Sequence, residues 1–148
     1  MQNLCWMPLL IRRQLPDAVK ISYKVRHSIP AILWFIFLSV LVYMPGSDVP
    51  SIGWAERVHA DKVVHFILFG VLFVLISIPV LRSGLEKGQK RKWLLITAAF
   101  IIVYGFITEV IQHYFIPGRT FDLLDWAADS AGVIAGFFFV KYLKKRFV

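Results

Sequence analysis

Side chains that could do chemistry gather in three short segments of an otherwise apolar chain. They are Asp61, Lys62 and His65 in HADKVVHF, Glu109 and Gln112 in TEVIQHYF, and Arg119, Asp122, Asp125 and Asp129 in PGRTFDLLDWAADSAG. Carboxylates and imidazole suit acid–base catalysis, whereas lysine and arginine recognise phosphate and carboxylate groups. The set therefore predicts a polar site that binds an anion, transfers protons, or does both.

The spacing of these residues places each group on one face of a helix. His65 follows Asp61 by four residues, which puts the two on the same side of a helix that begins near Asp61. In the third segment, Asp122, Asp125, Asp129, Gly132 and Gly136 follow one another at intervals of three or four residues. The two glycines form a GxxxG pattern, which lets another helix approach closely. This continuous stripe predicts that the aspartates face the inside of a helix bundle.

Hydropathy indicates the environment of these helices. Of the 148 residues, 58% are hydrophobic, and the mean hydropathy is +0.67. Four apolar runs predict helices at residues 29–44, 63–81, 93–116 and 123–140. A membrane-spanning helix needs about 20 apolar residues, so we expect an all-α integral membrane protein with a four-helix transmembrane bundle. Asp125 and Asp129 must then be shielded from lipid, and Pro30 and Pro79 are expected at helix ends.

The basic residues predict the orientation of the chain. Fourteen of the 17 lysines and arginines lie in residues 1–28, 82–92 and 141–148. Basic flanks stay on the cytoplasmic side, so both termini are expected in the cytoplasm, with short loops and the polar segments outside. The chain then divides into a basic lead (1–28), a transmembrane domain (29–140) and a basic tail (141–148). This arrangement accounts for the net charge of +8 without a nucleic-acid partner, and the single Cys5 excludes an internal disulfide.

Glu109 is the least expected of the polar residues. It lies seven residues before the end of its apolar run at Ile116, roughly 10 Å inside the helix end at 1.5 Å per residue. An ionisable group at such a depth needs a partner, here Lys62, His65 or Arg119, and usually marks a functional site. The alternative is a buried polar cluster that only holds the helices together.

Three quoted segments carry a resemblance to a known family. DKVVHF at 61–66, EVIQHYFIPGRTFDLLD at 109–125 and DSAG at 129–132 resemble the VanZ-like family of bacterial membrane proteins. The resemblance implies a small multi-pass protein of the bacterial inner membrane, with a link in the founding member to teicoplanin resistance. It implies no particular reaction. Many members have asparagine where this chain has Asp129.

Two classes of function fit these residues. In the first, an outer polar site binds the anionic headgroup of a lipid or a lipid-linked wall precursor. Lys62 and Arg119 would contact the phosphate, and Gln112, Asp122 and Asp129 would complete the binding site. Asp122 and Asp125, three and six residues after Arg119, are expected to orient its guanidinium. Glu109, His65 and Asp125 would be catalytic only if the protein is an enzyme.

In the second class, the protein is a non-catalytic accessory or scaffold of the cell envelope, and its polar cluster is structural. A transporter fits less well, because four helices leave little room for alternating access. The sequence contains no phosphate-binding glycine loop, and no motif in it indicates a particular cofactor. No metal is assigned, although His65, Glu109 and the aspartates could ligate a divalent cation. The lipid bilayer is the expected partner, and association of several copies of the chain stays open.

Overall fold

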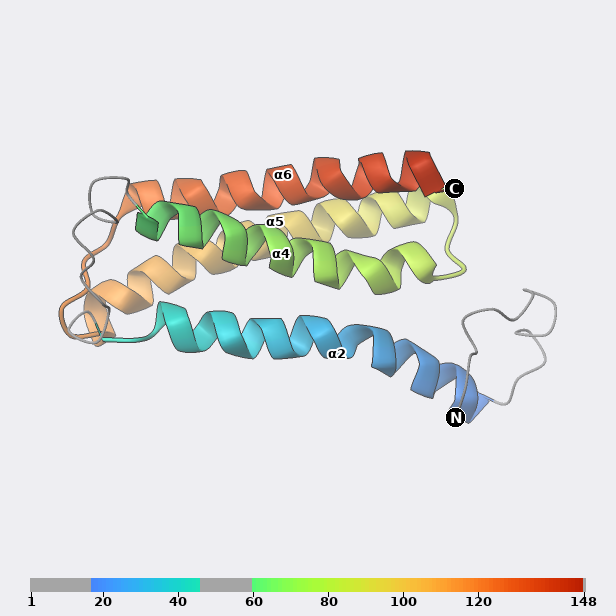
Figure 1. Cartoon of the computed structure of the whole chain (residues 1–148), viewed down its shortest axis with the longest axis horizontal. Coiled ribbons are helices and arrows are strands. Elements are labelled where there is room, and N and C mark those ends of the chain that lie inside the picture. Colours follow the sequence, from blue (N-terminus) through green and yellow to red (C-terminus); the bar gives the residue numbers. More distant parts are fainter. Residues whose placement is uncertain (1–16, 46–59, 148) are drawn as a thin grey trace.

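The computed structural model describes residues 17–45 and 60–147, with side chains described for 26–45 and 61–143. These residues form helices α2 (Asp17–Val42), α4 (Ala60–Arg82), α5 (Lys87–Phe115) and α6 (Leu123–Phe147), and no strand occurs among them (Figure 1). The predicted all-α class is therefore confirmed for the described part of the chain. The connection between α2 and α4 lies outside it.

The helices are longer than the apolar runs that predicted them. Helix α2 begins at Asp17, within the segment interpreted as the lead, so the helix extends further toward the N-terminus than the predicted residues 29–44; residues 1–16 lie outside the described residues. The division of the chain at residue 28 stays a prediction. Pro30 lies well inside α2 instead of at its end, whereas Pro79 lies in the last turn of α4, near the predicted helix end. Hydropathy marks where a chain is apolar, but lysine and arginine are good helix formers and let a helix continue into a basic flank.

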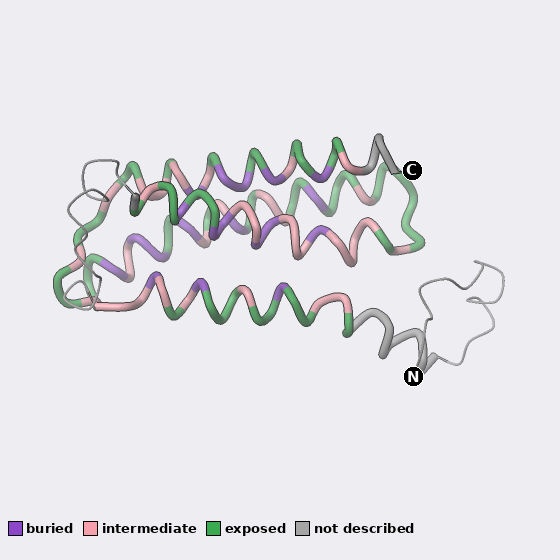
Figure 2. Tube along the Cα trace, viewed as in Figure 1, coloured by how far each residue is buried: buried purple, intermediate pink, exposed green. Residues whose placement is uncertain are grey.

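Helix α4 is the central helix of the bundle. It packs against α2, α5 and α6, while α2 packs chiefly on α4 (Figure 1). Side chains such as Leu38, Phe69, Phe73 and Val133 are buried between the helices. Residues on the outward faces are exposed (Figure 2), and many of the exposed side chains are large and apolar. Lipid tails are as apolar as these side chains, so a bundle with an apolar exterior is compatible with a lipid environment.

In the part of the chain that the structure describes, three helices are long and apolar enough to cross a membrane, by length and composition. The stretches are Asp61–Arg82, Lys87–Phe115 and Leu123–Leu143. The apolar part of α2, Arg26–Val42, is shorter. The described residues thus form a helical membrane protein with three candidate spans and one shorter apolar helix.

Glycines let α4 and α6 approach each other closely. An added Cβ on Gly132 would overlap the carbonyl oxygen of Phe66 in α4, and one on Gly136 would lie 2.9 Å from the carbonyl oxygen of Gly70. The close contact predicted from the GxxxG pattern is therefore confirmed, and its partner is α4. Gly70, which hydropathy and spacing had not singled out, supplies the facing surface.

The connection between α5 and α6 is a tight turn. Gly118 has φ 74°, a left-handed conformation that glycine adopts without a steric penalty. The turn predicted at Pro117–Gly118 is thus present, and it brings the start of α6 directly beside the end of α5.

Candidate functional site

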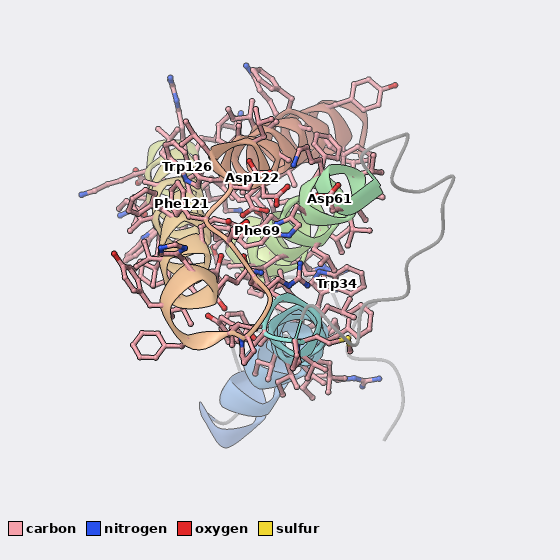
Figure 3. The ribbon with its side chains drawn as sticks, turned by 90° about the vertical axis from the view of Figure 1, so that its left-hand side faces the viewer. Trp34, Asp61, Phe69, Phe121, Asp122 and Trp126 are labelled. Atoms are coloured by element: carbon pink, nitrogen blue, oxygen red, sulfur yellow. The ribbon has the colours of Figure 1, made fainter. Side chains whose placement is uncertain are left out.

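The predicted polar residues gather at one end of the bundle, in an outer and an inner layer. This end is formed by the start of α4, the end of α5 and the start of α6, and Figure 3 looks onto it. In the outer layer, the ammonium nitrogen of Lys62 lies 2.7 Å from Oδ2 of Asp122 and 2.9 Å from Oδ1 of Asp125. Asp61, which is exposed, lies 3.4 Å from the same nitrogen. The hydrogen bond from Lys62 lowers the pKa of Asp122 below its ordinary value.

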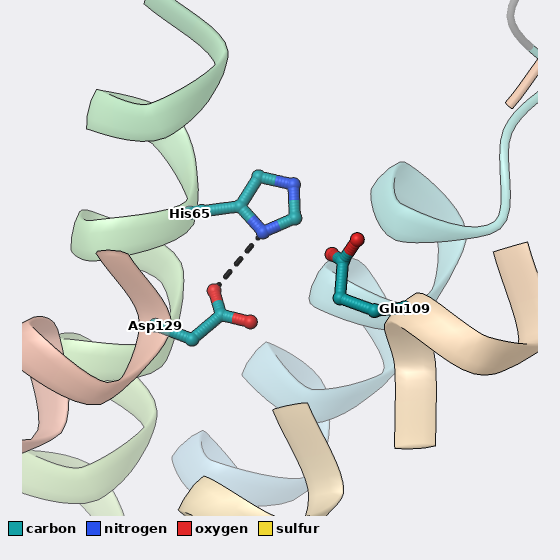
Figure 4. A group of neighbouring side chains, drawn as sticks. All are labelled: His65, Glu109 and Asp129. Carbon is teal, nitrogen blue, oxygen red and sulfur yellow. Dashed lines mark hydrogen bonds and ion pairs between the residues drawn. The ribbon is translucent and has the colours of Figure 1, made fainter. Parts of the chain in front are cut away.

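The inner layer consists of His65, Glu109 and Asp129, one from each of α4, α5 and α6 (Figure 4). Nδ1 of His65 lies 3.0 Å from Oδ1 of Asp129. The backbone N–H of Asp122 donates to Oε2 of Glu109 at 3.1 Å, which links the inner layer to the outer one. His65 is 6% exposed, and the two carboxylates are fully buried.

Each buried carboxylate has one oxygen with no hydrogen-bond partner. Among the described residues, Oε1 of Glu109 and Oδ2 of Asp129 are buried and unpaired. The second of these lies against Gly105 of α5, where an added Cβ would come within 2.9 Å of it. Because an unpaired buried carboxylate oxygen is costly, this part of the cluster is incompletely satisfied by the protein.

Gln112 contributes its amide to the packing of α2. Its Nε2 donates to the carbonyl oxygen of Val42 at 2.8 Å, and the side chain is buried. Val42 is the last residue of α2, so this bond satisfies one of the carbonyls that a helix end leaves free. This donor is therefore used within the bundle, and a part for Gln112 in ligand binding stays a prediction.

Arg119 occupies a different place from the one its spacing had indicated. We expected Asp122 and Asp125 to orient its guanidinium, but both carboxylates contact Lys62. The reason is that α4 packs along α6 and carries Lys62 to them. Nε of Arg119 donates weakly to the carbonyl oxygen of Met44 at 3.4 Å. Within the described part of the chain no carboxylate forms an ion pair with this half-buried arginine.

Sequence reasoning did not find Gly105. It lies one turn before Glu109 on α5, the spacing that puts two residues on one helix face. That position provided a signal that could have identified it as part of the site. Nothing in the spacing alone indicated that Asp129 would be the partner of His65.

Helices of this length and apolarity, joined at one end by a buried polar cluster, define a small helical integral membrane protein. The chain belongs to the VanZ/LLP1 family, whose model matches residues 4–144. This confirms the resemblance carried by the three polar segments. No curated protein and no solved structure gives a significant match.

Proposed function

We propose that this protein is a multi-pass protein of the bacterial inner membrane whose polar end faces outward and binds an anionic headgroup. All four helices would cross the bilayer, with both termini in the cytoplasm, as the distribution of basic residues indicates. The ligand would be the phosphate-bearing headgroup of a lipid or of a lipid-linked wall precursor. In the context of the VanZ/LLP1 family, such binding would alter the tolerance of the cell envelope to teicoplanin.

Arg119 is the observation that carries this proposal. It lies beside the polar end, half-buried, and no described carboxylate neutralises it. A guanidinium has five N–H donors in a planar fork. Among the described residues, the side-chain hydrogen bond of Arg119 is the one from Nε to the carbonyl oxygen of Met44. The remaining donors suit bidentate recognition of a phosphate. The proposal therefore rests on Arg119 more than on Lys62, whose charge two aspartates already offset.

The ion pairs of Lys62 with Asp122 and Asp125 also favour the second candidate, a non-catalytic accessory or scaffold, because they offset the charge of Lys62 within the protein. In that case the contacts of Lys62 and Gln112 would join the helices and do nothing more. The two candidates differ in what they expect of Arg119: a scaffold needs a positive charge or a contact to Met44, whereas a headgroup site needs the fork itself. Turnover of the ligand by Glu109, His65 and Asp125 is not required by either.

The orientation predicts which loops react with an impermeant thiol reagent. In a Cys5→Ser background, a cysteine at Thr120 in the α5–α6 connection should be labelled from outside intact spheroplasts. One at Gly84 in the α4–α5 connection should react only after lysis. Both positions suit the test, since Thr120 is exposed and an added side chain at Gly84 meets open space. The reverse pattern of labelling would place the polar end in the cytoplasm and contradict the proposal.

Arg119 variants test the headgroup site directly. Wild-type protein purified in mild detergent should retain an anionic lipid or lipid-linked phosphate that mass spectrometry detects. Arg119→Ala should lose most of it, and Arg119→Lys should lose nearly as much, because lysine keeps the charge but not the fork. We would measure teicoplanin tolerance of cells at matched membrane levels in parallel.

Arg91→Ala is the matched control, because Arg91 is an exposed arginine near the start of α5, at the opposite end of the helix. It should retain lipid like the wild type. Equal retention in wild type, Arg119→Ala and Arg91→Ala would eliminate the headgroup site. If Arg119→Lys retained the lipid at the wild-type level, the positive charge of Arg119 would be sufficient and its planar fork would not be needed.

A further inference from the structure

The inner layer holds more negative charge than the protein around it can satisfy. Glu109 and Asp129 are both fully buried, and among the described residues the basic side chain that pairs with this layer is His65, through Asp129. The ammonium of Lys62 is bonded to the outer aspartates. If both inner carboxylates are ionised, at least one negative charge is left over at a buried position, which is costly unless a cation or a proton is added.

The arrangement of the ligand atoms suits a cation. One atom from each of His65, Glu109 and Asp129 lies within 4.8 Å of the other two, and the three side chains point toward a common space between three helices (Figure 4). Bonds of about 2.0–2.2 Å to zinc place neighbouring ligands roughly 3–4 Å apart, so the side chains would need to draw together by about 1 Å. Small rotations of the side chains are sufficient for such a shift.

We propose that His65, Glu109 and Asp129 form a binding site for a divalent transition-metal cation such as Zn²⁺ or Mn²⁺. One imidazole nitrogen and two carboxylate oxygens form a mixed donor set that such cations accept, whereas Ca²⁺ requires six to eight oxygens. Three protein ligands also leave a coordination position open for water or for an oxygen of a ligand. This proposal goes beyond headgroup binding and does not depend on it.

Two further observations point to an ion. Among the described residues, Oε1 of Glu109, Oδ2 of Asp129 and Oγ of Ser130 are buried without a hydrogen-bond partner, and the first two belong to the proposed ligands. In addition, the backbone N–H of Asp122 holds Oε2 of Glu109, and such supporting bonds to ligand carboxylates are typical of metal sites. The outer acidic group of Asp61, Asp122 and Asp125 does not share these features, because Lys62 already bonds to it.

The experiment measures metal content of the full chain, purified in detergent with an affinity tag that contains no histidine. After incubation with Zn²⁺ or Mn²⁺ and removal of free metal, elemental analysis should find one ion per wild-type chain. EDTA should lower the melting temperature, and adding the same metal should restore it by about 5 °C or more when the metal is in hundredfold excess over its Kd. Ca²⁺ should not replace it.

Glu109→Gln and Asp129→Asn keep the size of the side chains and should each reduce the retained metal at least tenfold. Asp61→Asn and His113→Ala, which alter exposed residues near the same end, should retain it. No bound metal in the wild type, or equal retention in all five proteins, would overturn the proposal. If the inner variants fail to fold, the wild type decides: a melting temperature insensitive to EDTA and to added metal overturns the proposal equally. None of these readouts involves lipid, so failure here leaves the headgroup site standing.

Discussion

Gly132→Ala is expected to destabilise the bundle by about 3 kcal/mol or more, near the upper end of the usual range for overpacking. The added methyl group would overlap the carbonyl oxygen of Phe66. Because that obstacle is backbone, no change of rotamer can relieve it, and α4 and α6 must move apart. Both helices carry residues of the inner layer, so their separation should also disturb the contact between His65 and Asp129.

The measurement is the melting temperature in detergent, which we expect to fall by roughly 5–10 °C. Gly88→Ala is the matched control, since Gly88 is a helical glycine of α5 with nothing within 4 Å of an added Cβ. It should be neutral or slightly stabilising, because alanine favours a helix by about 1 kcal/mol over glycine. If Gly132→Ala were as stable as Gly88→Ala, the close contact between α4 and α6 would be disproved.

His65→Leu should be the most damaging change within the polar cluster. It removes the hydrogen-bonding partner of Asp129, a residue with no exposed surface. Breaking a buried pair by removing one member typically costs about 3–5 kcal/mol, because the other charge stays buried without compensation. We therefore expect His65→Leu to reach the membrane in reduced amounts and to unfold at a markedly lower temperature.

The double variant His65→Leu/Asp129→Ala tests the cause. Replacing both members of a buried ion pair by apolar residues is often tolerated, so the double variant should recover part of the stability lost in His65→Leu. A thermodynamic cycle with the single Asp129→Ala variant gives the coupling between the two side chains. Strictly additive losses would show that His65 and Asp129 do not interact and would contradict the inner layer as described.

Much of the fold could be predicted from the sequence, because the signals involved are local. Apolar runs indicate helices wherever the environment is lipid, and Gly118 after Pro117 indicates a turn through its backbone preferences alone. Helical periodicity placed Asp125 and Asp129 on the same face as Gly132 and Gly136, and the structure confirms that this face meets another helix. The helix ends were less predictable, since α2 continues into a basic segment that hydropathy does not mark.

Only the tertiary structure decided which polar residues meet. Spacing along the chain favoured Arg119 as the partner of Asp122, which lies three residues away, but Lys62 takes that place from sixty residues away. Periodicity fixes the face on which a side chain lies, whereas its partner depends on how far one helix is shifted along its neighbour. Here that shift is set where the backbones of α4 and α6 touch at Gly70 and Gly132, a contact between segments distant in sequence that no local pattern specifies.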